Sequence, residues 1–457
     1  MFGYDKDRVY DKSKYIAENP FLIVDFPDDD CARKIASRAV LIKSIYRLWC
    51  EGDSWEELFT AIQALPSSFT QPYYTASRSW KFDIVSFNRN LLPDEQEHFR
   101  LKFEPYLPFE GPVRMRNPDN TFACVLHYRK QIDEIQHLYL GTFVAEGQRK
   151  TNDRYDLKKR HYIGPTSTCA ELAFLMSNQI QTQPGSFVWD CFVGTGSILV
   201  AASAHGGICL GSDIDQRVLS GLKKGKKAGS IRQNFAQYNL VQPDLVRMDL
   251  SSLPITKRPI FDGIACDPPY GIRAGARRTK THEDDLTAVN THKANTEVYK
   301  PDDVIIDLLD IAARMLRVGK RIAFLLPTLG THTDDEVPQH PCLELVSNSE
   351  EKLTLLISRR LITMKKIAEY DPSKTEEYKA FTRQSIVSQQ LSYSDLMDIT
   401  IESNRSEGKT RSQRRERQLE NARKWIKTNT ELSFCSIHSH ISIVSYRFLS
   451  SWTRAIC

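Results

Sequence analysis

The segment Phe187-Val188-Trp189-Asp190-Cys191-Phe192-Val193-Gly194-Thr195-Gly196-Ser197 determines how most of this 457-residue chain folds. Its apolar start is typical of a buried strand, its glycines of a turn, and its end of the first turn of a helix. The glycines allow backbone amides to approach a ligand that a side chain would exclude. Because Gly-x-Gly is weak evidence by itself, the interpretation depends on the surrounding sequence.

Predicted strands and helices alternate around this segment. One helix precedes it, and a second is predicted from Val304 to Leu316. The helix before it has Leu172, Ala173, Leu175, Met176 and Ile180 on one face. Six further strands are predicted at Ile208–Ser212, Val246–Leu250, Phe261–Ala265, Arg321–Leu326, Leu343–Val346 and Leu361–Met364. This alternation predicts an α/β domain in which a mostly parallel sheet of seven strands carries helices on both faces.

Four of these strands end in an acid: Asp190, Asp213, Asp249 and Asp267. Any one of them alone would more often be a turn or capping residue. In an open parallel sheet, however, ligands bind at the carboxyl ends of the strands. Together the four acids predict a ligand site at that edge of the sheet.

The last of these acids opens the turn Asp267-Pro268-Pro269-Tyr270. Two prolines cannot continue a strand or a helix, so the turn holds an acid rigidly beside an aromatic ring. If this is an amino-group site, Asp267 and the Pro268 carbonyl accept hydrogen bonds from an exocyclic amine, and Tyr270 stacks on the base. The polar insertion from Ala274 to Pro301 fits a lid or substrate loop and a plain surface loop equally well.

A second module precedes this domain. Its strands are predicted at Phe21–Phe26, Val40–Trp49, Trp80–Ile84, Thr121–Tyr128 and Leu138–Ala145, and its helices at 31–39, Trp55–Leu65 and Asp94–Phe103. This order predicts an α+β module over residues 1–147, followed by a polar linker at 148–161. Residues 371–457 form a polar, basic extension, in which the stretch 405–427 carries nine Lys or Arg against three Glu.

The composition limits the class of protein. A net charge of +5 is modest for this length, so a nucleic-acid surface requires local clustering of charge. The ten cysteines include no C-x-x-C pair, which predicts reduced thiols in a cytoplasmic or nuclear protein and no metal site. We expect a cytoplasmic location. The apolar runs are shorter than the roughly 20 residues of a membrane span.

Several of these motifs, taken together, resemble one family. The glycine turn, the turn at 267–270 and the stretch Tyr162-Ile163-Gly164-Pro165-Thr166-Ser167 resemble class I S-adenosylmethionine-dependent amino-methyltransferases. That stretch and Ser358-Arg359-Arg360-Leu361-Ile362-Thr363-Met364 resemble, more narrowly, the catalytic subunit of eukaryotic tRNA guanosine-10 N2-methyltransferases. The similarity covers roughly residues 20–370. Relatives carry Asp-Pro-Phe where this chain has Asp190-Cys191-Phe192.

The resemblance implies roles for both modules. Residues 1–147 are implied to be a ferredoxin-like and THUMP tRNA-binding module. Residues 162–370 are implied to be a Rossmann-like class I methyltransferase domain that methylates the exocyclic N2 amine of guanosine 10. The implied catalytic residues are Asp267, Pro268, Pro269 and Tyr270. The implied cofactor-binding residues are Thr166, Ser167, Asp190, Phe192, Gly194, Thr195, Gly196, Asp213 and Asp249.

Within that set the resemblance implies a division of labour. Asp190 and the amides around Gly194 and Gly196 hold the methionine part of S-adenosylmethionine. Asp213 accepts from the ribose hydroxyls, and Asp249 meets the adenine amine. Thr166 and Ser167 border the pocket, or alternatively cap the following helix.

The family's catalytic subunit is also implied to bind a small zinc-binding activator protein. The strand around Val246-Arg247-Met248 is a candidate edge to which such a partner adds a strand. Two other functions remain open from the residues. One is a DNA adenine or cytosine amino-methyltransferase, which shares the Asp-Pro-Pro-Tyr chemistry. The other is a non-catalytic RNA-binding scaffold with a methyltransferase fold.

Overall fold

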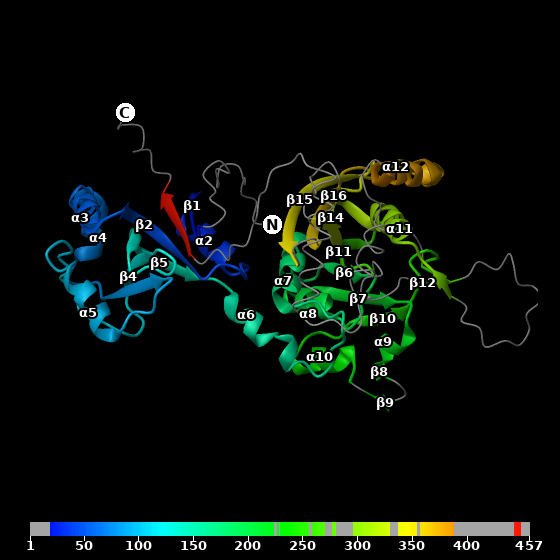
Figure 1. Ribbon diagram of the computed structural model, residues 1–457, viewed down its shortest axis with the longest axis horizontal. Coiled ribbons are helices and arrows are strands. Elements are labelled where there is room, and N and C mark those ends of the chain that lie inside the picture. Colours follow the sequence, from blue (N-terminus) through cyan, green and yellow to red (C-terminus); the bar gives the residue numbers. More distant parts are fainter. Residues whose placement is uncertain are drawn as a thin grey trace, which may run out of the picture. The chain divides into compact units, whose positions relative to one another are not determined.

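The computed structural model describes residues 19–223, 226–227, 229–255, 258–269, 277–279, 296–329, 337–353, 357–387 and 443–448 (Figure 1). The chain divides into two compact units. Unit 1 comprises residues 1–150 and 439–457, and unit 2 comprises residues 151–438. Among the helices of the described part, none is long and apolar enough to cross a bilayer.

Unit 1 is built on a six-stranded sheet with the order β1-β17-β2-β5-β4-β3. Its strands are β1 (Phe21–Phe26), β17 (Ile443–Phe448), β2 (Ser44–Gly52), β5 (Ile135–Glu146), β4 (Asn120–Tyr128) and β3 (Trp80–Phe87). Its helices are α2 (Asp29–Ala36), α3 (Trp55–Gln63), α4 (Ser67–Tyr74) and α5 (Pro93–Leu101). β17 lies parallel to both β1 and β2, whereas β5 is antiparallel to β2 and β4. An α+β module was predicted here, and the structure has one.

Three elements of unit 1 differ from their predictions. The strand predicted from Val40 begins only at Ser44, because the backbone of Ala39 and Lys43 accepts hydrogen bonds from residues 148 and 147 instead of joining a ladder. Helix α4 was not predicted: it has no side-chain cap, and Pro72 lies inside it. Strand β17 comes from the C-terminal stretch, for which no structure was predicted.

The region predicted to be a linker contains α6 (Arg149–Arg154) and a 3-10 turn (Leu157–Lys159). Unit 2 then carries a seven-stranded sheet with the order β10-β7-β6-β11-β14-β16-β15. The strands are β6 (Phe187–Asp190), β7 (Ile208–Asp213), β10 (Asp244–Arg247), β11 (Phe261–Cys266), β14 (Leu316–Leu329), β15 (Leu343–Lys352) and β16 (Ile357–Lys366). The first five are mutually parallel, and β16 runs antiparallel to both of its neighbours. The predicted mostly parallel sheet is therefore confirmed.

Helices cover both faces of this sheet (Figure 1). They are α7 (Ala170–Gln179), α8 (Ser197–Ala204), α9 (Gln216–Ser220), α10 (Ile231–Gln237), α11 (Pro301–Met315) and α12 (Thr375–Val387). Two small hairpins complete the unit: β8 (Leu222–Lys223) with β9 (Lys226–Lys227), and β12 (Arg277–Thr279) with β13 (Thr296–Val298). The second, called the β12–β13 hairpin below, lies within the polar insertion.

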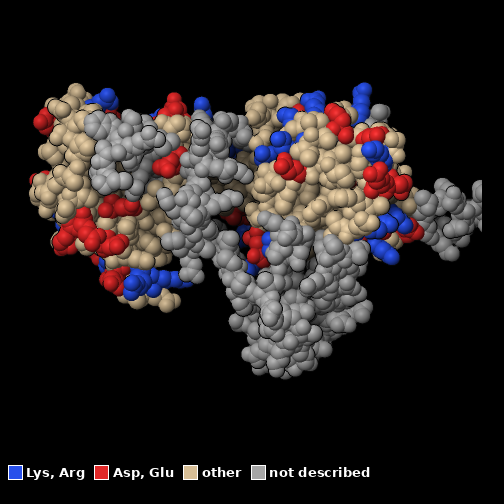
Figure 2. All heavy atoms as spheres, turned by 90° about the horizontal axis from the view of Figure 1, so that it is seen from above, with Lys and Arg blue, Asp and Glu red and all other residues tan. Residues whose placement is uncertain are grey.

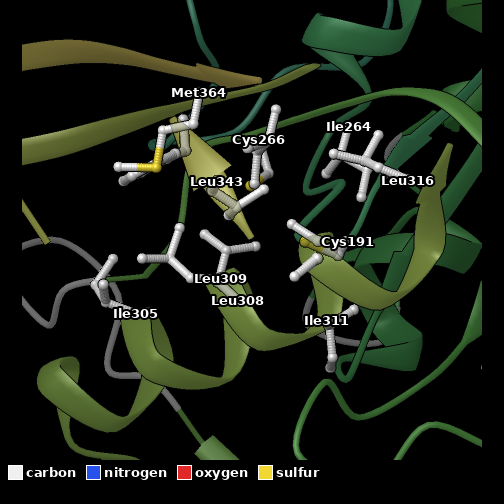
Figure 3. Packing of buried hydrophobic residues seen from close by; sticks show 14 of the residues in the cluster. Cys191, Ile264, Cys266, Ile305, Leu308, Leu309, Ile311, Leu316, Leu343 and Met364 are labelled. Atoms are coloured by element: carbon white, nitrogen blue, oxygen red, sulfur yellow. The ribbon is translucent and has the colours of Figure 1, made fainter. Parts of the chain in front are cut away.

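The core of unit 2 lies between α11 and the sheet. Leu308, Leu309 and Ile311 of α11 belong to one hydrophobic cluster with Cys266 and Leu316, and all of them are almost fully buried (Figure 3). Each such aliphatic side chain contributes roughly 1.5–3 kcal/mol when it leaves water. This packing holds β11, and therefore the turn that follows it, against a rigid support.

Candidate active site

The four acids predicted at strand ends meet at one edge of the sheet of unit 2. Asp190 and Asp213 are the last residues of β6 and β7, and Asp267 directly follows β11. Asp249 lies two residues beyond the end of β10 rather than inside the predicted strand 246–250. Since β10, β7, β6 and β11 are consecutive neighbours, the acids line a single carboxyl edge.

The glycine turn between β6 and α8 needs its two glycines for different reasons. Both have positive φ, +49° at Gly194 and +79° at Gly196. A Cβ on Gly196 would lie 2.7 Å from Cγ2 of Ile231, so this glycine permits close packing. Among the described residues, a Cβ on Gly194 would have only the Phe192 carbonyl within 4 Å, so this glycine leaves space that suits a ligand.

The N–H groups of both glycines already have partners within the protein. Gly194 donates to Oδ2 of Asp213 at 3.1 Å, and Gly196 donates to the Val193 carbonyl at 2.7 Å. The prediction that amides around Gly194 and Gly196 hold the methionine part stays a prediction. In the structure, the N–H of Gly194 also fixes the position of the Asp213 carboxylate.

Asp190 is 1% exposed and accepts a hydrogen bond from the N–H of Phe192 at 3.1 Å. Burial raises the pKa of its carboxyl well above the ordinary value, and the charges of Asp213 and Asp267 raise it further. Burial also raises the pKa of Asp213, although hydrogen bonds from Asp215 and Gly194 oppose that shift. These neighbouring carboxylates repel one another when they are ionised, so a cation bound at this edge of the sheet would be stabilised by them.

The loop at 162–167 is tied to the glycine turn. Ser167 Oγ accepts from the N–H of Gly164 at 2.9 Å and lies 2.6 Å from Thr195 Oγ1. Thr166 is exposed. The alternative that Thr166 and Ser167 cap helix α7 is wrong, because the N-cap position is Cys169.

Two residues that the motifs did not indicate hold this loop in place. Asn234, which is fully buried in α10, accepts from the N–H of Tyr162 at 2.9 Å and donates to its carbonyl at 2.7 Å. The buried Arg160 donates to Ser197 Oγ, in the first turn of α8, at 2.7 Å. Neither contact has a sequence signal, because each joins segments that are far apart along the chain.

The turn at 267–270, called the acceptor turn below, directly follows a residue of the hydrophobic core. Cys266 is fully buried, Asp267 and Pro269 are half-buried, and Pro268 is buried. The charge of Asp267 is close enough to raise the pKa of Asp190. Tyr270 lies outside the described residues, as do most residues of the 274–301 insertion.

Asp249 has several protein donors. Its Oδ1 accepts from the N–H and the hydroxyl of Ser251 at 2.9 and 2.8 Å, and its Oδ2 accepts from the N–H of Thr279 at 2.5 Å. The contact with Thr279 in the β12–β13 hairpin was not foreseen from the sequence. In the part of the chain that the structure describes, no three His, Cys, Asp or Glu are arranged to hold a metal ion.

Comparison with known proteins agrees with this geometry. Residues 9–149 match the Tmrp11 THUMP N-terminal domain family, and residues 158–298 match the RMKL-like methyltransferase domain family. Fold and site thus define a methyltransferase that carries a THUMP-type N-terminal domain.

The more specific comparison is with proteins named tRNA (guanine(10)-N(2))-methyltransferase. The chain is 36% identical to TRMT11 of Mus musculus over 373 residues, covering 78% of this chain and 81% of the mouse protein. The identity is also 36% with TRMT11 of Homo sapiens (78% and 81% covered) and 34% with the Schizosaccharomyces pombe protein (78% and 76% covered). This chain belongs to the tRNA (guanine(10)-N(2))-methyltransferase family. A solved structure, TrmN from Thermus thermophilus, is 17% identical with a TM-score of 0.34 over 70% of this chain and 82% of its own, too weak to add to the assignment.

Proposed function

We propose that the chain transfers a methyl group from S-adenosylmethionine to the exocyclic N2 amine of guanosine 10 in tRNA. The observation that carries this proposal is the carboxyl edge of unit 2. There an acceptor turn at Asp267 lies beside a glycine turn and three further acids, in a chain that belongs to a family named for this reaction.

The residues at this edge fit the cofactor. Asp213 and Asp267 lie close enough to Asp190 to raise its pKa, in addition to the larger effect of burial, and the ammonium of the methionine part would offset the repulsion among these carboxylates. The backbone N–H groups of Gly194 and Asp215 hold the two oxygens of the Asp213 carboxylate in place, and we assign the ribose hydroxyls to this carboxylate. Gly194, which leaves space for a ligand, lies between Asp190 and Asp213 in the sequence.

When bound, S-adenosylmethionine supplies an electrophilic methyl group. An aromatic amine is a poor nucleophile, since its lone pair is delocalised into the ring. Asp267 and the Pro268 carbonyl accept hydrogen bonds from that amine and favour a pyramidal nitrogen. They also stabilise the positive charge that grows on nitrogen as the bond forms. We assign stacking on the base to Tyr270, with a contribution of about 1–3 kcal/mol.

We assign tRNA binding mainly to unit 1, which contains the match to the THUMP N-terminal domain. On the face shown in Figure 2, the described residues of unit 1 present both acidic and basic side chains and form no broad basic patch. Recognition of tRNA by shape and by scattered phosphate contacts is therefore a better account of this face than one broad basic patch.

We further propose that a small zinc-binding activator protein docks on β10. This strand is an edge of the seven-stranded sheet, and Val246 on it is 40% exposed, so it can accept an added strand. Co-expression followed by size-exclusion chromatography tests this proposal. Val246→Glu is expected to separate the two proteins, and unchanged co-elution contradicts docking at this strand.

All cysteines in the described part are free thiols, in keeping with a cytoplasmic location.

The experiment that tests the function uses the full chain, with and without the activator. It is incubated with unmodified tRNA, with the same tRNA bearing another base at position 10, and with DNA. Mass spectrometry then identifies the methylated nucleosides. We expect N2-methylguanosine from the first substrate alone. Methylated adenine in DNA would overturn the proposal, and N2-methylguanosine from the second substrate would contradict the choice of position 10.

A further inference from the structure

The Asp249 carboxylate is nearly saturated by protein donors. An ionised carboxylate offers about four lone-pair positions. The N–H and hydroxyl of Ser251 occupy Oδ1, and the N–H of Thr279 occupies one position on Oδ2. Counting the donors among the described residues, one acceptor position is left, on the oxygen that also holds Thr279.

Thr279 belongs to the β12–β13 hairpin, which has its own internal support. Arg278 and Glu297 are directly opposed across the two strands, and Arg278 Nε lies 2.5 Å from Glu297 Oε1. The guanidinium of Arg278 also lies 5.8 Å from the ring centroid of Tyr299. A contact that holds Thr279 in place therefore also restrains the second strand, through Glu297, and the ring of Tyr299, through Arg278.

A second anchor fixes the other end of this hairpin. The hydroxyl of Tyr299 donates to Oδ2 of Asp307 in α11, and Lys379 of α12 donates to Oδ1 of the same carboxylate at 2.6 Å. Tyr299 is 3% exposed and packs with Val304 and Phe192. Phe192 belongs to the glycine turn, so this anchor lies against the cofactor side of the site.

The order of the strands shows which site residues lie along this edge of the sheet. Asp267 directly follows β11, and Thr279 contacts Asp249, two residues beyond the end of β10. Between β11 and β10 in the sheet lie β6 and β7, whose ends carry Asp190 and Asp213. The two anchors therefore place the hairpin along the edge where the cofactor residues lie.

We propose that the Asp249 carboxylate anchors the β12–β13 hairpin and thereby couples it to the cofactor, whose adenine amine, assigned to Asp249 by the family resemblance, takes the remaining acceptor position. Hairpin docking and adenine binding then stabilise the same orientation of one carboxylate, so each favours the other. The second half of this inference rests on the proposed function, because it requires the cofactor. The first half concerns only contacts within this chain.

Amide hydrogen exchange of the full-length chain tests the anchor without ligand. Thr279→Pro removes the donor N–H and leaves Asp249 intact, whereas the matched control Thr279→Ala keeps that N–H. We expect exchange in peptides containing β12 and residues 296–299 to become at least about tenfold faster in Thr279→Pro than in Thr279→Ala. Asp249→Ala should show the same acceleration, and Asp215→Ala, which alters a nearby acid that caps α9, should not. Equal exchange in the two Thr279 variants overturns the anchor.

The same measurement with saturating S-adenosylhomocysteine tests the coupling. In the wild-type chain the ligand should slow hairpin exchange about tenfold, and in Thr279→Pro its affinity should fall by a similar factor. If the ligand binds without slowing the hairpin, the shared carboxylate is contradicted while the proposed function stands. If calorimetry detects no binding at all, the proposed function and the coupling both fail, and the ligand-free comparison still decides the anchor.

Discussion

The hydroxyl oxygens of Ser167 and Thr195 lie 2.6 Å apart and share a hydrogen bond. This contact joins the loop at 162–167 to the glycine turn, two segments that the sequence presented as separate motifs. Because Ser167 also accepts the N–H of Gly164, one hydroxyl determines the shape of the loop and its distance from the turn.

Ser167→Ala should weaken cofactor binding by about fivefold, since a hydrogen bond of this kind contributes roughly 1 kcal/mol. Calorimetric titration with S-adenosylhomocysteine measures the effect. Ser220→Ala, which removes an exposed hydroxyl bonded only within α9, is the control and should bind like the wild type. Equal affinities of the two variants would show that the contact does not support the site.

Asp267→Ala should lower methyl transfer by at least about 100-fold while leaving cofactor affinity within about threefold. The carboxylate is assigned to the amine of the target base, and Asp190 and Asp213 are assigned to the cofactor. A labelled-methyl assay with tRNA, run beside calorimetry, separates the two effects. Undiminished turnover would contradict the catalytic role of Asp267. A parallel loss of cofactor affinity would show that Asp267 binds the cofactor instead.

Cofactor binding should weaken as the pH falls, because the ionised form of Asp190 is the one that attracts the ammonium. Burial raises the pKa of this carboxyl, so protonation begins at a higher pH than for an ordinary aspartate. Below the raised pKa the affinity should fall by up to about tenfold per pH unit. In Asp190→Asn the affinity should be lower throughout, and its pH dependence should be reduced to the part contributed by Asp213. Titrations between about pH 8 and pH 5 would contradict this assignment if both proteins showed the same slope.

The parts of the site that were predicted from sequence share one property: each is encoded within a short stretch of chain. Asp190, Gly194 and Gly196 follow one another through a strand, a turn and a helix, and the order of neighbouring elements placed Asp213 and Asp267 at the same edge. Local periodicity and a general rule for parallel sheets were therefore sufficient.

The contacts that escaped prediction are those between distant segments. Thr279 meets Asp249 across 30 residues, Asn234 meets Tyr162 across 72, and Lys379 meets Asp307 across 72. None of these pairs has a periodic pattern or a motif, because only the folded chain brings them together. Strand β17 escaped for the same reason, since its partners lie more than 390 residues earlier, at β1 and β2.

His340 should make the stability of unit 2 depend on pH. Burial, aided by the charge of Arg314, lowers the pKa of this histidine from 6.5 to about 4, and its Nδ1 accepts the N–H of Cys342 at 3.1 Å. Between these two pKa values the unfolded chain binds a proton that the folded chain does not, so stability falls as the pH falls. The loss amounts to about 3 kcal/mol over that range. His340→Asn keeps an acceptor and should lose less stability over the same window. Urea denaturation at several pH values measures this, and parallel curves would contradict it.

Strand β17 should be required for the stability of unit 1. In the described part of the chain, β1 has a ladder only with β17, and all six of its residues are paired there. With β17 absent, β1 and β2 would be separated by the width of one strand, about 10 Å from each other. Removing residues 439–457 should therefore lower the unfolding temperature of unit 1, by calorimetry, and leave that of unit 2 unchanged.

A point substitution tests the same strand without shortening the chain. Tyr446 lies opposite Val24 on one side and Arg47 on the other, and Tyr446→Pro removes one backbone donor from this central position. It should lower the unfolding temperature of unit 1 by several degrees, whereas the matched control Tyr446→Ala, which keeps that backbone donor, should lower it less. If β1 instead pairs directly with β2 once β17 is lost, the truncated chain will melt like the full-length chain. That result would show β17 to be an addition to the sheet rather than the strand that completes it.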